Sequence, residues 1–172
     1  MCPDCQAEYN NPFDRRHFSQ TNSCQSCGIQ LHLSSSDGRV ETTPELIHQI
    51  ILKEWEEGKI VAIKGIGGYL LTCSAENEKA VRRLRERKQR LGKPFALMYP
   101  DLESLSSFDL GPQAQASLKS PEAPIVLLPK AKNNSLAKGI AEGLDEVGGM
   151  LPYAPLFEWL LKPFGRPIVA TS

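Results

Sequence analysis

The spacing of hydrophobic positions predicts a series of helices and strands in all but the first quarter of the chain. Residues 42–58 carry a threonine cap, a proline at the helix start and apolar residues at helical spacing before Gly58, which predicts a helix. The apolar runs 59–65 and 69–74, on either side of a Gly-rich turn, predict two strands. The remaining predicted elements are helix 76–90, strand 95–99, a short helix capped by Asp101, strand 124–129, a Gly-rich passage 143–155, helix 156–162 and strand 167–170.

Strands and helices therefore mix without strict alternation, which predicts an α/β or α+β fold with helices layered on a sheet. The 20 Lys and Arg residues balance the 20 Asp and Glu residues, so the net charge predicts no general attraction to nucleic acid or to a membrane surface. The chain has no membrane-length apolar run and no targeting segment, so we expect a cytoplasmic protein. Because residues 166–172 stop within a strand pattern, we also expect a piece of a longer protein.

Four of the five cysteines form two Cys-x-x-Cys pairs separated by eighteen residues. This spacing is typical of a zinc ribbon or knuckle, in which four thiolates surround one ion. The expected ligands are Cys2, Cys5, Cys24 and Cys27. Gly28, directly after the second pair, suits a turn with positive φ. A segment of this size has too little core to fold alone, so the zinc ion is expected to be structural.

Other interpretations of the cysteines fit less well. Disulfides do not suit a cytoplasmic chain, and a redox pair would need a βαβ context that is missing here. His17 is an alternative fourth ligand. Cys73 lies in an apolar run, so we expect a buried small hydrophobic residue and not a nucleophile.

The most basic segment, residues 82–95, contains seven Lys or Arg residues. On a helical wheel, Lys88 falls in the inward stripe of Val81, Leu84 and Leu91. An unpaired buried ammonium is costly, so Lys88 must either reach solvent or meet an anion. A second stripe of basic residues is explained by a solvent-exposed face of the helix. That stripe consists of Arg83, Arg87 and Arg90.

The sequence after this stripe indicates where the helix ends. Gly92 and the position before Pro94 disfavour helical backbone, so the helix should stop between Lys88 and Leu91. The chain can then turn several cations toward one ligand. The predicted anion ligands are Lys88, Arg90 and Lys93.

Several runs together resemble the HypF family, the carbamoyltransferases of nickel–iron hydrogenase maturation. Residues 59–98, 124–129, 144–156 and 167–172 are similar to its YrdC-like domain, most specifically in the patterns K-x-R-x-x-K-P-F-A-L-M and V-G-x-M-L-P-Y-x-P-L. The paired cysteines resemble the second zinc finger of that family. The resemblance implies a zinc-finger module at 1–33, a linker at 34–43 and a YrdC-like nucleotide-binding domain at 44–172, a twisted sheet with flanking helices that is truncated at its C-terminus.

The resemblance also implies an activity. The family uses ATP and Mg²⁺ to convert a carbamate derived from carbamoyl phosphate into carbamoyl-adenylate, with release of pyrophosphate, for cyanide-ligand synthesis. A further domain then passes the carbamoyl group to the partner HypE. By the same resemblance Lys88 and Arg90 match the phosphate-binding K-x-R, Thr171 and Ser172 match the start of a T-S-x-N nucleotide loop, and Lys64, Gly67 and Gly68 match the substrate-pocket segment. No catalytic side chain is required, because the carbamate oxygen can attack the α-phosphate itself.

The chain departs from the family pattern at several positions: Leu70 replaces a histidine, Ser74 replaces an aspartate, and Phe157 and Glu158 stand where the family often has a histidine pair. We therefore expect nucleotide binding with little or no turnover by this chain alone. Two alternatives stay open. One is a tRNA threonylcarbamoyl-adenylate synthase, whose partner would be tRNA or double-stranded RNA. The other is a zinc-stapled module that binds nucleic acid or a protein partner without catalysis.

Overall fold

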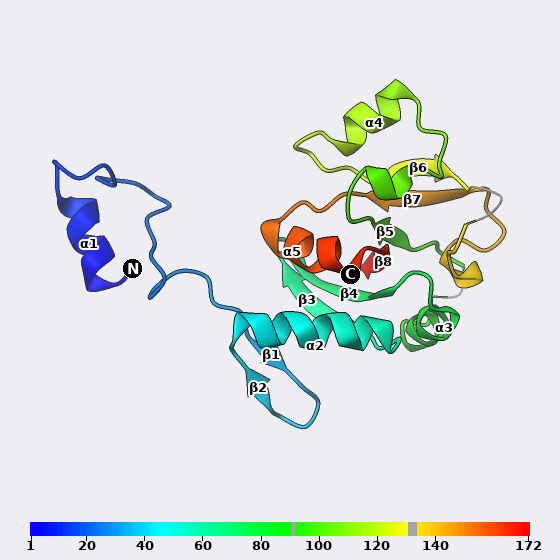
Figure 1. Cartoon of the computed structure of the whole chain (residues 1–172), viewed down its shortest axis with the longest axis horizontal. Helices are drawn as coiled ribbons and strands as arrows, with labels where there is room; N and C mark the ends of the chain where they lie inside the picture. Colours follow the sequence, from blue (N-terminus) through cyan, green and yellow to red (C-terminus); the bar gives the residue numbers. More distant parts are fainter. Residues whose placement is uncertain (91, 131–133) are drawn as a thin grey trace. The chain divides into compact units, whose positions relative to one another are not determined.

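The structure, a computed structural model, describes residues 1–90, 92–130 and 134–172. These residues form two compact units, Met1–Ile47 and His48–Ser172, which are described separately (Figure 1). The division falls inside helix α2 (Pro44–Glu56). The domain limits expected from the sequence, 1–33, 34–43 and 44–172, stay predictions.

The first unit contains one short helix and one hairpin. Helix α1 (Pro3–Asn10) follows the N-cap Cys2 and has a proline in its first turn, where the missing N–H costs nothing. Strands β1 (Leu33–Ser34) and β2 (Val40–Glu41) pair antiparallel around a turn that contains Gly38 at φ 83°. The predicted linker therefore contains a small hairpin.

The second unit is built on a six-stranded sheet with the order β3-β4-β8-β5-β7-β6. Neighbouring strands are antiparallel except β5 and β7, which run parallel. The last strand along the chain thus lies inside the sheet. This mixed sheet confirms the predicted fold class. The strands are β3 (Val61–Gly65), β4 (Gly68–Ser74), β5 (Ala96–Met98), β6 (Val126–Pro129), β7 (Glu146–Met150) and β8 (Ile168–Thr171).

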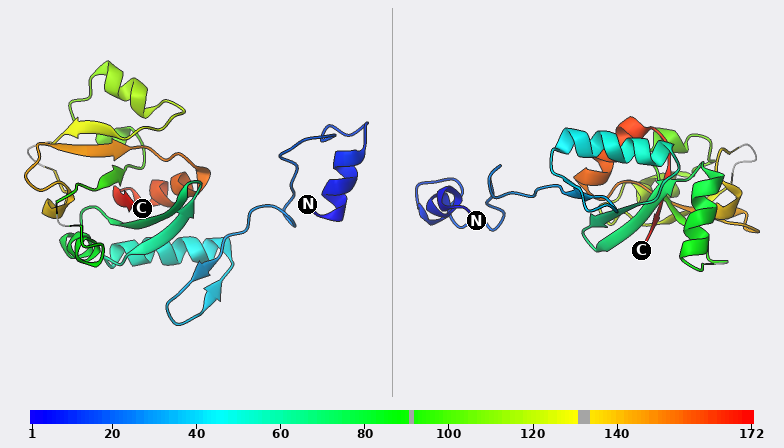
Figure 2. Two further views of the ribbon diagram at one scale, coloured as in Figure 1. Left: turned by 180° about the vertical axis from the view of Figure 1, so that it is seen from behind. Right: turned by 90° about the horizontal axis from the view of Figure 1, so that it is seen from below.

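Helices cover both faces of this sheet. Helices α2 and α5 (Pro155–Phe164) lie on one side and α3 (Glu78–Arg87) on the other, as the right-hand view of Figure 2 shows. On the first side the buried Trp55 ring meets Phe164 at 5.1 Å between centroids, and its indole N–H donates to the Thr72 hydroxyl at 3.1 Å. On the second side Val81 and Leu84 of α3 belong to the main hydrophobic cluster. Strand β8 is consequently buried along its whole length.

Shorter elements complete the unit. The 3-10 turn η1 (Glu103–Leu105) has Leu102 and not the predicted Asp101 at its N-cap, although the Asp101 carboxylate accepts a hydrogen bond from the Ser104 N–H at 2.8 Å. Helix α4 (Pro112–Leu118) and the 3-10 turn η2 (Lys138–Ile140) were not predicted. Both are too short for a periodic apolar pattern to be readable.

One strand was not predicted from the sequence. The Gly-rich passage 143–155 contains strand β7, which pairs with both β5 and β6. A Cβ at Gly149 would lie 2.5 Å from the Leu128 side chain, and one at Gly148 would lie 2.8 Å from Ile125. The glycines leave room for these two residues, whose side chains lie over the β7 backbone. The apolar alternation that reveals a strand is therefore missing from β7 itself.

Tyr99 provides a test of the packing on the α3 side. Its ring packs on Phe108 at 5.8 Å, yet its buried hydroxyl has no hydrogen-bond partner in the described part of the chain. An unsatisfied buried hydroxyl costs about 1–3 kcal/mol. We expect Tyr99→Phe to raise the free energy of unfolding by about 1 kcal/mol. Urea unfolding followed by tryptophan fluorescence reports on this unit, because both tryptophans lie in it.

The exposed Tyr69 is the matched control, and Tyr69→Phe should leave the same transition unchanged. A loss of stability in Tyr99→Phe would contradict the prediction, because the hydroxyl would then be making a favourable contact.

Candidate nucleotide site and metal centre

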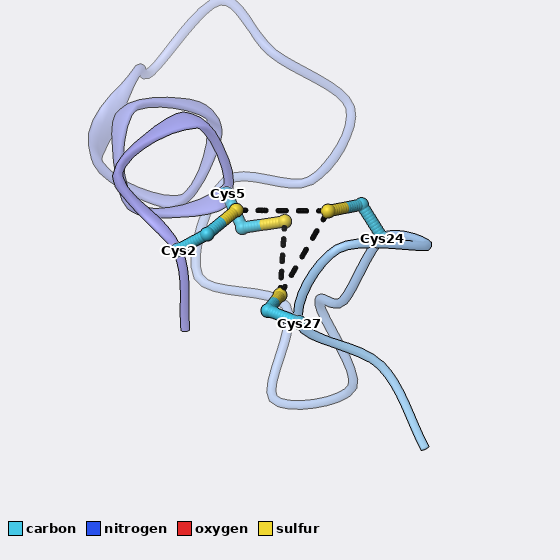
Figure 3. A group of neighbouring side chains, drawn as sticks. All are labelled: Cys2, Cys5, Cys24 and Cys27. Atoms are coloured by element: carbon cyan, nitrogen blue, oxygen red, sulfur yellow. Dashed lines mark hydrogen bonds between the residues drawn. The ribbon is translucent and has the colours of Figure 1, made fainter. Parts of the chain in front are cut away.

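The four predicted zinc ligands come together in the first unit (Figure 3). Their sulfur atoms all lie within 4.8 Å of one another. The separations are 3.6 Å for Cys2 and Cys24, 3.7 Å for Cys5 and Cys27, and 3.9 Å for Cys24 and Cys27. Zinc–sulfur bonds of about 2.3 Å in a tetrahedron hold the sulfurs about 3.8 Å apart. The group therefore has the dimensions of a tetrahedral zinc site.

The two cysteine pairs come from different local structures. Cys2 caps helix α1 and the buried Cys5 lies in its first turn. Cys24 and Cys27 lie in a tight turn, in which the Cys24 carbonyl accepts hydrogen bonds from the N–H groups of Cys27 at 3.2 Å and Gly28 at 2.6 Å. One pair of ligands thus comes from the start of a helix and the other pair from a knuckle-like turn.

The prediction of positive φ at Gly28 is wrong. Gly28 is not among the residues with positive φ. A Cβ at this position would instead lie 2.7 Å from the Cys24 carbonyl oxygen. The glycine is explained by close approach of two backbone segments, because real Cβ atoms do not come this near to an oxygen.

The protonation of the thiols also fits a metal. Backbone N–H groups of Cys24 and Cys2 lower the pKa of the Cys27 thiol to about 6, and those of Cys27 and Ser26 lower the pKa of Cys24. Burial, in contrast, raises the pKa of Cys5. Zinc binds thiolates, so Cys27 supplies negative charge at neutral pH and a bound ion would deprotonate the remaining thiols. The alternative ligand His17 stacks on Phe18 at 4.2 Å and is not in the sulfur group.

In the second unit, helix α3 stops where the candidate phosphate ligands begin. Lys88 is the C-cap, and the next residue, Gln89, has a left-handed φ of 50°. The Arg90 N–H donates to the Arg85 carbonyl and the Gln89 N–H to the Glu86 carbonyl, both at 3.1 Å, which is a Schellman motif. Helix α3 thus ends one residue before the predicted range of 88–91, with Lys88 as its cap, and the predicted helix 76–90 is longer than α3 at both ends.

The inward stripe of α3 is partly as predicted. Val81 and Leu84 are buried, and Lys88 is half-buried. Leu91, the fourth member, lies outside the described residues. Of the second stripe, Arg83 donates to the Gly58 carbonyl at 3.2 Å, and Arg90 turns back toward the sheet after the helix has ended.

The left-handed Gln89 offers a test of this helix end. A residue with a side chain is strained in this conformation and glycine is not, whereas a β-branched residue is strained more. We expect Gln89→Gly to raise the free energy of unfolding by about 0.5 kcal/mol and Gln89→Val to lower it by about 1 kcal/mol. Urea unfolding of the two variants provides the measurement. Equal stabilities for Gly and Val at this exposed position would contradict the assigned backbone conformation.

The turn brings two cations to the end of strand β8. The Lys88 ammonium donates to the Ser172 carbonyl at 2.5 Å, and the Arg90 guanidinium donates to the Thr171 hydroxyl at 3.3 Å. Four of the predicted nucleotide residues therefore meet. No ion pair within the described ranges includes either cation. Their charges are available to an anion.

Lys93, the third predicted cation, contributes differently. Lys93 is exposed, and its backbone carbonyl accepts hydrogen bonds from Arg85 and Arg90, both at 3.2 Å. Its backbone thus helps to hold the turn. An anion-binding role for its ammonium stays a prediction.

Arg85 was missed by the sequence reasoning. Its guanidinium donates to the carbonyls of Gly139 at 2.6 Å, Arg90 at 2.5 Å and Lys93 at 3.2 Å. Its carbon lies 4.5 Å from the centre of the Phe95 ring. Burial lowers its pKa, with a smaller contribution from the charge of Arg90. The only sequence signal was its position four residues after the buried Val81 on α3.

Strand register places the predicted substrate-pocket segment beside these cations. Leu71 of β4 pairs with Thr171 of β8, and Lys64 of β3 pairs with Tyr69 of β4. Side chains two residues apart share a face, so Lys64 and Thr171 lie on the same side of the sheet. That side is the one covered by α3. No hydrogen bond in the described part of the molecule joins Lys64 to Lys88 or Arg90.

The glycines of this hairpin leave space above it. A Cβ at Gly67 or Gly68 would meet no atom within 4 Å, and Gly68 has a φ of 126°. At Gly65, however, a Cβ would lie 2.7 Å from the Tyr153 hydroxyl. Tyr153 therefore packs against the hairpin, a contact that the sequence did not reveal. The open tip would let backbone N–H groups approach a ligand.

The three other positions singled out in β4 have separate environments. Leu70 is half-buried and directly precedes Leu71, which pairs with Thr171 of β8. Ser74 is buried at the far end of the strand, where its hydroxyl accepts from the Glu76 N–H at 3.4 Å. Ser74 thus closes the turn toward α3. Cys73 is fully buried, and burial raises its pKa to about 12, so it is a core residue as predicted.

Comparison with known proteins agrees with both parts of the structure. The family model of Sua5, YciO and YrdC, described as telomere recombination, matches residues 53–172, and the HypF finger model matches residues 1–34. The chain belongs to the Sua5/YciO/YrdC family and carries a HypF-type zinc finger at its N-terminus.

Among individual proteins, the chain is homologous to HypF carbamoyltransferases. It is 43% identical to HypF of Rhodobacter capsulatus over all of its 172 residues, which are 23% of that protein. It is 46% identical to HypF of Synechocystis over 116 residues, or 67% of this chain and 15% of that protein. The chain thus spans about a quarter or less of the length of these HypF relatives.

Solved structures show the same relationship. Full-length HypF in a phosphate- and nucleotide-bound form matches with a TM-score of 0.82 and 43% identity, over 100% of this chain and 22% of that one. Sua5 of P. abyssi, complexed with L-threonine, matches with a TM-score of 0.65 and 28% identity, over 77% of this chain and 40% of that one. Within the described part of this chain, no helix is both long and apolar enough to span a bilayer.

Proposed function

We propose that this chain is the part of a carbamoyltransferase that activates a carbamoyl group with ATP, as carbamoyl-adenylate, for cyanide-ligand synthesis in nickel–iron hydrogenase maturation. The observation that carries the proposal is the match to HypF over the whole chain, zinc finger included. The pair Lys88 and Arg90 at the end of β8 supplies the local chemistry.

In this reaction a carbamate oxygen attacks the α-phosphorus of ATP, and the bond from that phosphorus to the bridging oxygen breaks. Negative charge moves to the departing pyrophosphate. Lys88 and Arg90 are already oriented by Ser172 and Thr171, so they stabilise that charge without rearrangement. Mg²⁺ bound with the ATP phosphates would add charge neutralisation at the same place. No side chain acts as a nucleophile, and positioning carries the catalysis.

The remaining parts of the reaction belong to the longer relatives. Carbamoyl phosphate is the proposed source of the carbamate, and a HypE-type protein is the proposed acceptor. The chain spans less than a quarter of the length of HypF of R. capsulatus, so we expect it to bind nucleotide with little or no turnover alone. Leu70, where the family pattern has histidine, pairs with Ile63 of β3 and lies on the face of the sheet opposite to Lys64 and Thr171.

A second candidate function is that of the threonylcarbamoyl-adenylate synthases of tRNA modification. The L-threonine-bound Sua5 structure supports it, because that protein shares the sheet. Its match covers 77% of this chain, whereas HypF matches all of it. The two functions differ in the co-substrate that the site accepts, carbamoyl phosphate or threonine with bicarbonate.

Lysine acetylation tests the nucleotide site on this chain directly. We expect ATP to protect Lys88 and Lys93 from a water-soluble acetylating reagent, as quantified by mass spectrometry. The exposed Lys79, on the same helix as the Lys88 cap, serves as the internal control and should be labelled equally with and without ATP. Equal labelling of all three lysines would favour the zinc-stapled scaffold without chemistry.

A further inference from the structure

The guanidinium of Arg85 connects two segments that are more than forty residues apart in the sequence. Its Nε and Nη2 donate to the Gly139 carbonyl at 2.9 and 2.6 Å, in the turn η2. Its Nη1 donates to the carbonyls of Arg90 at 2.5 Å and Lys93 at 3.2 Å, in the segment that follows α3. A planar fork with fixed donors can hold several acceptors at defined angles, which a lysine ammonium cannot do.

Phe95 packs with its ring against the guanidinium groups of Arg85 and Arg90. Its buried ring lies 4.5 Å from the carbon of the Arg85 guanidinium and 5.2 Å from that of Arg90. Its N–H donates to the Ile140 carbonyl at 2.9 Å. The ring thus supports both guanidinium groups, and its backbone is tied to the same η2 turn that Arg85 holds.

On the side of the candidate anion site, Arg85 contacts the backbone carbonyls of Arg90 and Lys93. Arg90 is held in turn by the Lys93 and Pro94 carbonyls at 3.2 and 2.7 Å, with its remaining Nη1 on Thr171. Arg85 therefore fixes the backbone from which the Arg90 side chain extends. If that backbone moved, both the Arg90 guanidinium and the neighbouring Lys88 would shift relative to β8.

We propose that Arg85 is a positioning residue, which holds the backbone at Arg90 and Lys93 in the conformation that aims Lys88 and Arg90 at a phosphate-bearing ligand. The identity of the ligand rests on the proposed function, whereas the positioning role does not. Arg85 acts through the carbonyls of Arg90 and Lys93 and does not touch the ligand. Its geometry is what matters, so a lysine that keeps the charge cannot replace it.

The experiment compares Arg85→Lys and Arg85→Ala with Arg82→Lys and Arg82→Ala. Arg82 lies on the exposed side of α3 and pairs with Glu86 at 3.8 Å, so its variants change the same helix and the same charge. The first readout is amide hydrogen exchange of residues 88–96 without nucleotide. The second is the ratio of ATP to AMP affinity, measured by titration of the 172-residue chain. The melting temperature of each variant reports on global stability.

We expect both Arg85 variants to exchange the amides of Arg90, Lys93 and Phe95 faster than wild type. The ATP affinity should fall about tenfold, while the AMP affinity and the Arg82 variants change little, because a displaced segment loses its contacts with the outer phosphates. A merely structural role would lower the melting temperature and weaken both nucleotides equally. Unchanged exchange in Arg85→Lys, or wild-type ATP affinity with faster exchange, would overturn the positioning role. Faster exchange in a protein that binds no ATP even as wild type would instead overturn the proposed nucleotide function alone.

Discussion

Replacing Cys24 with serine will abolish stoichiometric zinc binding and unfold the first unit. The four sulfurs are spaced for one tetrahedral ion, and the unit has only Cys5 and Ile47 as buried hydrophobic residues. Zinc binding in small fingers contributes about 10–16 kcal/mol, far more than so small a core can supply. Elemental analysis should give about one zinc per wild-type chain and close to none in the variant. Limited proteolysis should then cut within residues 1–47.

Two controls separate this effect from general damage. Ser26→Ala changes an exposed residue between the two ligands of the knuckle and should retain the metal. His17→Ala should also retain it, because His17 lies outside the sulfur group. The second unit, followed by tryptophan fluorescence, should unfold at the same urea concentration in all variants. Wild-type protein without zinc, or a Cys24→Ser chain that stays folded and metal-bound, would contradict the metal site.

Replacing Arg90 or Lys88 with alanine will weaken ATP binding by about 10- to 100-fold, the loss expected for a charge-assisted hydrogen bond to phosphate. Both side chains reach the end of β8, and no carboxylate forms an ion pair with either of them in the part of the chain that the structure describes. The affinity for AMP should fall less, because the outer phosphates carry most of the charge. Isothermal titration with ATP and AMP provides the measurement.

The matched control is Arg87→Ala, which removes an exposed cation from the last turn of α3. Its ATP affinity should stay within about twofold of wild type at physiological salt, because exposed charges at a distance are screened. An equal loss in Arg87→Ala and Arg90→Ala would show that net charge, and not a site, governs the binding.

The features that the sequence predicted are those with local signals. The stripe of Val81 and Leu84 predicts α3, and the residues around Pro94 predict its end, because helical periodicity and proline geometry act within a few residues. The zinc site follows from spacing alone, since two Cys-x-x-Cys pairs need only a turn each to surround an ion.

The features that were missed depend on contacts between distant segments. Strand β7 is recognisable only when Leu128 and Ile125 of the neighbouring segment lie over its glycines. Arg85 looks like any basic helix residue until the Gly139 carbonyl, 54 residues later in the chain, comes within reach. Gly28 is a third case. The sequence correctly indicated that the turn requires a glycine, but the reason is the missing Cβ and not a positive φ.

Isotope exchange between pyrophosphate and ATP tests the proposed function most directly. It should be measured on a chain extended past Ser172, once with carbamoyl phosphate and once with threonine plus bicarbonate. We predict exchange that depends on carbamoyl phosphate and is lost in Lys88→Ala. Exchange that depends on threonine would contradict the account and assign the chain to tRNA modification, and exchange with neither would leave a zinc-stapled binding module.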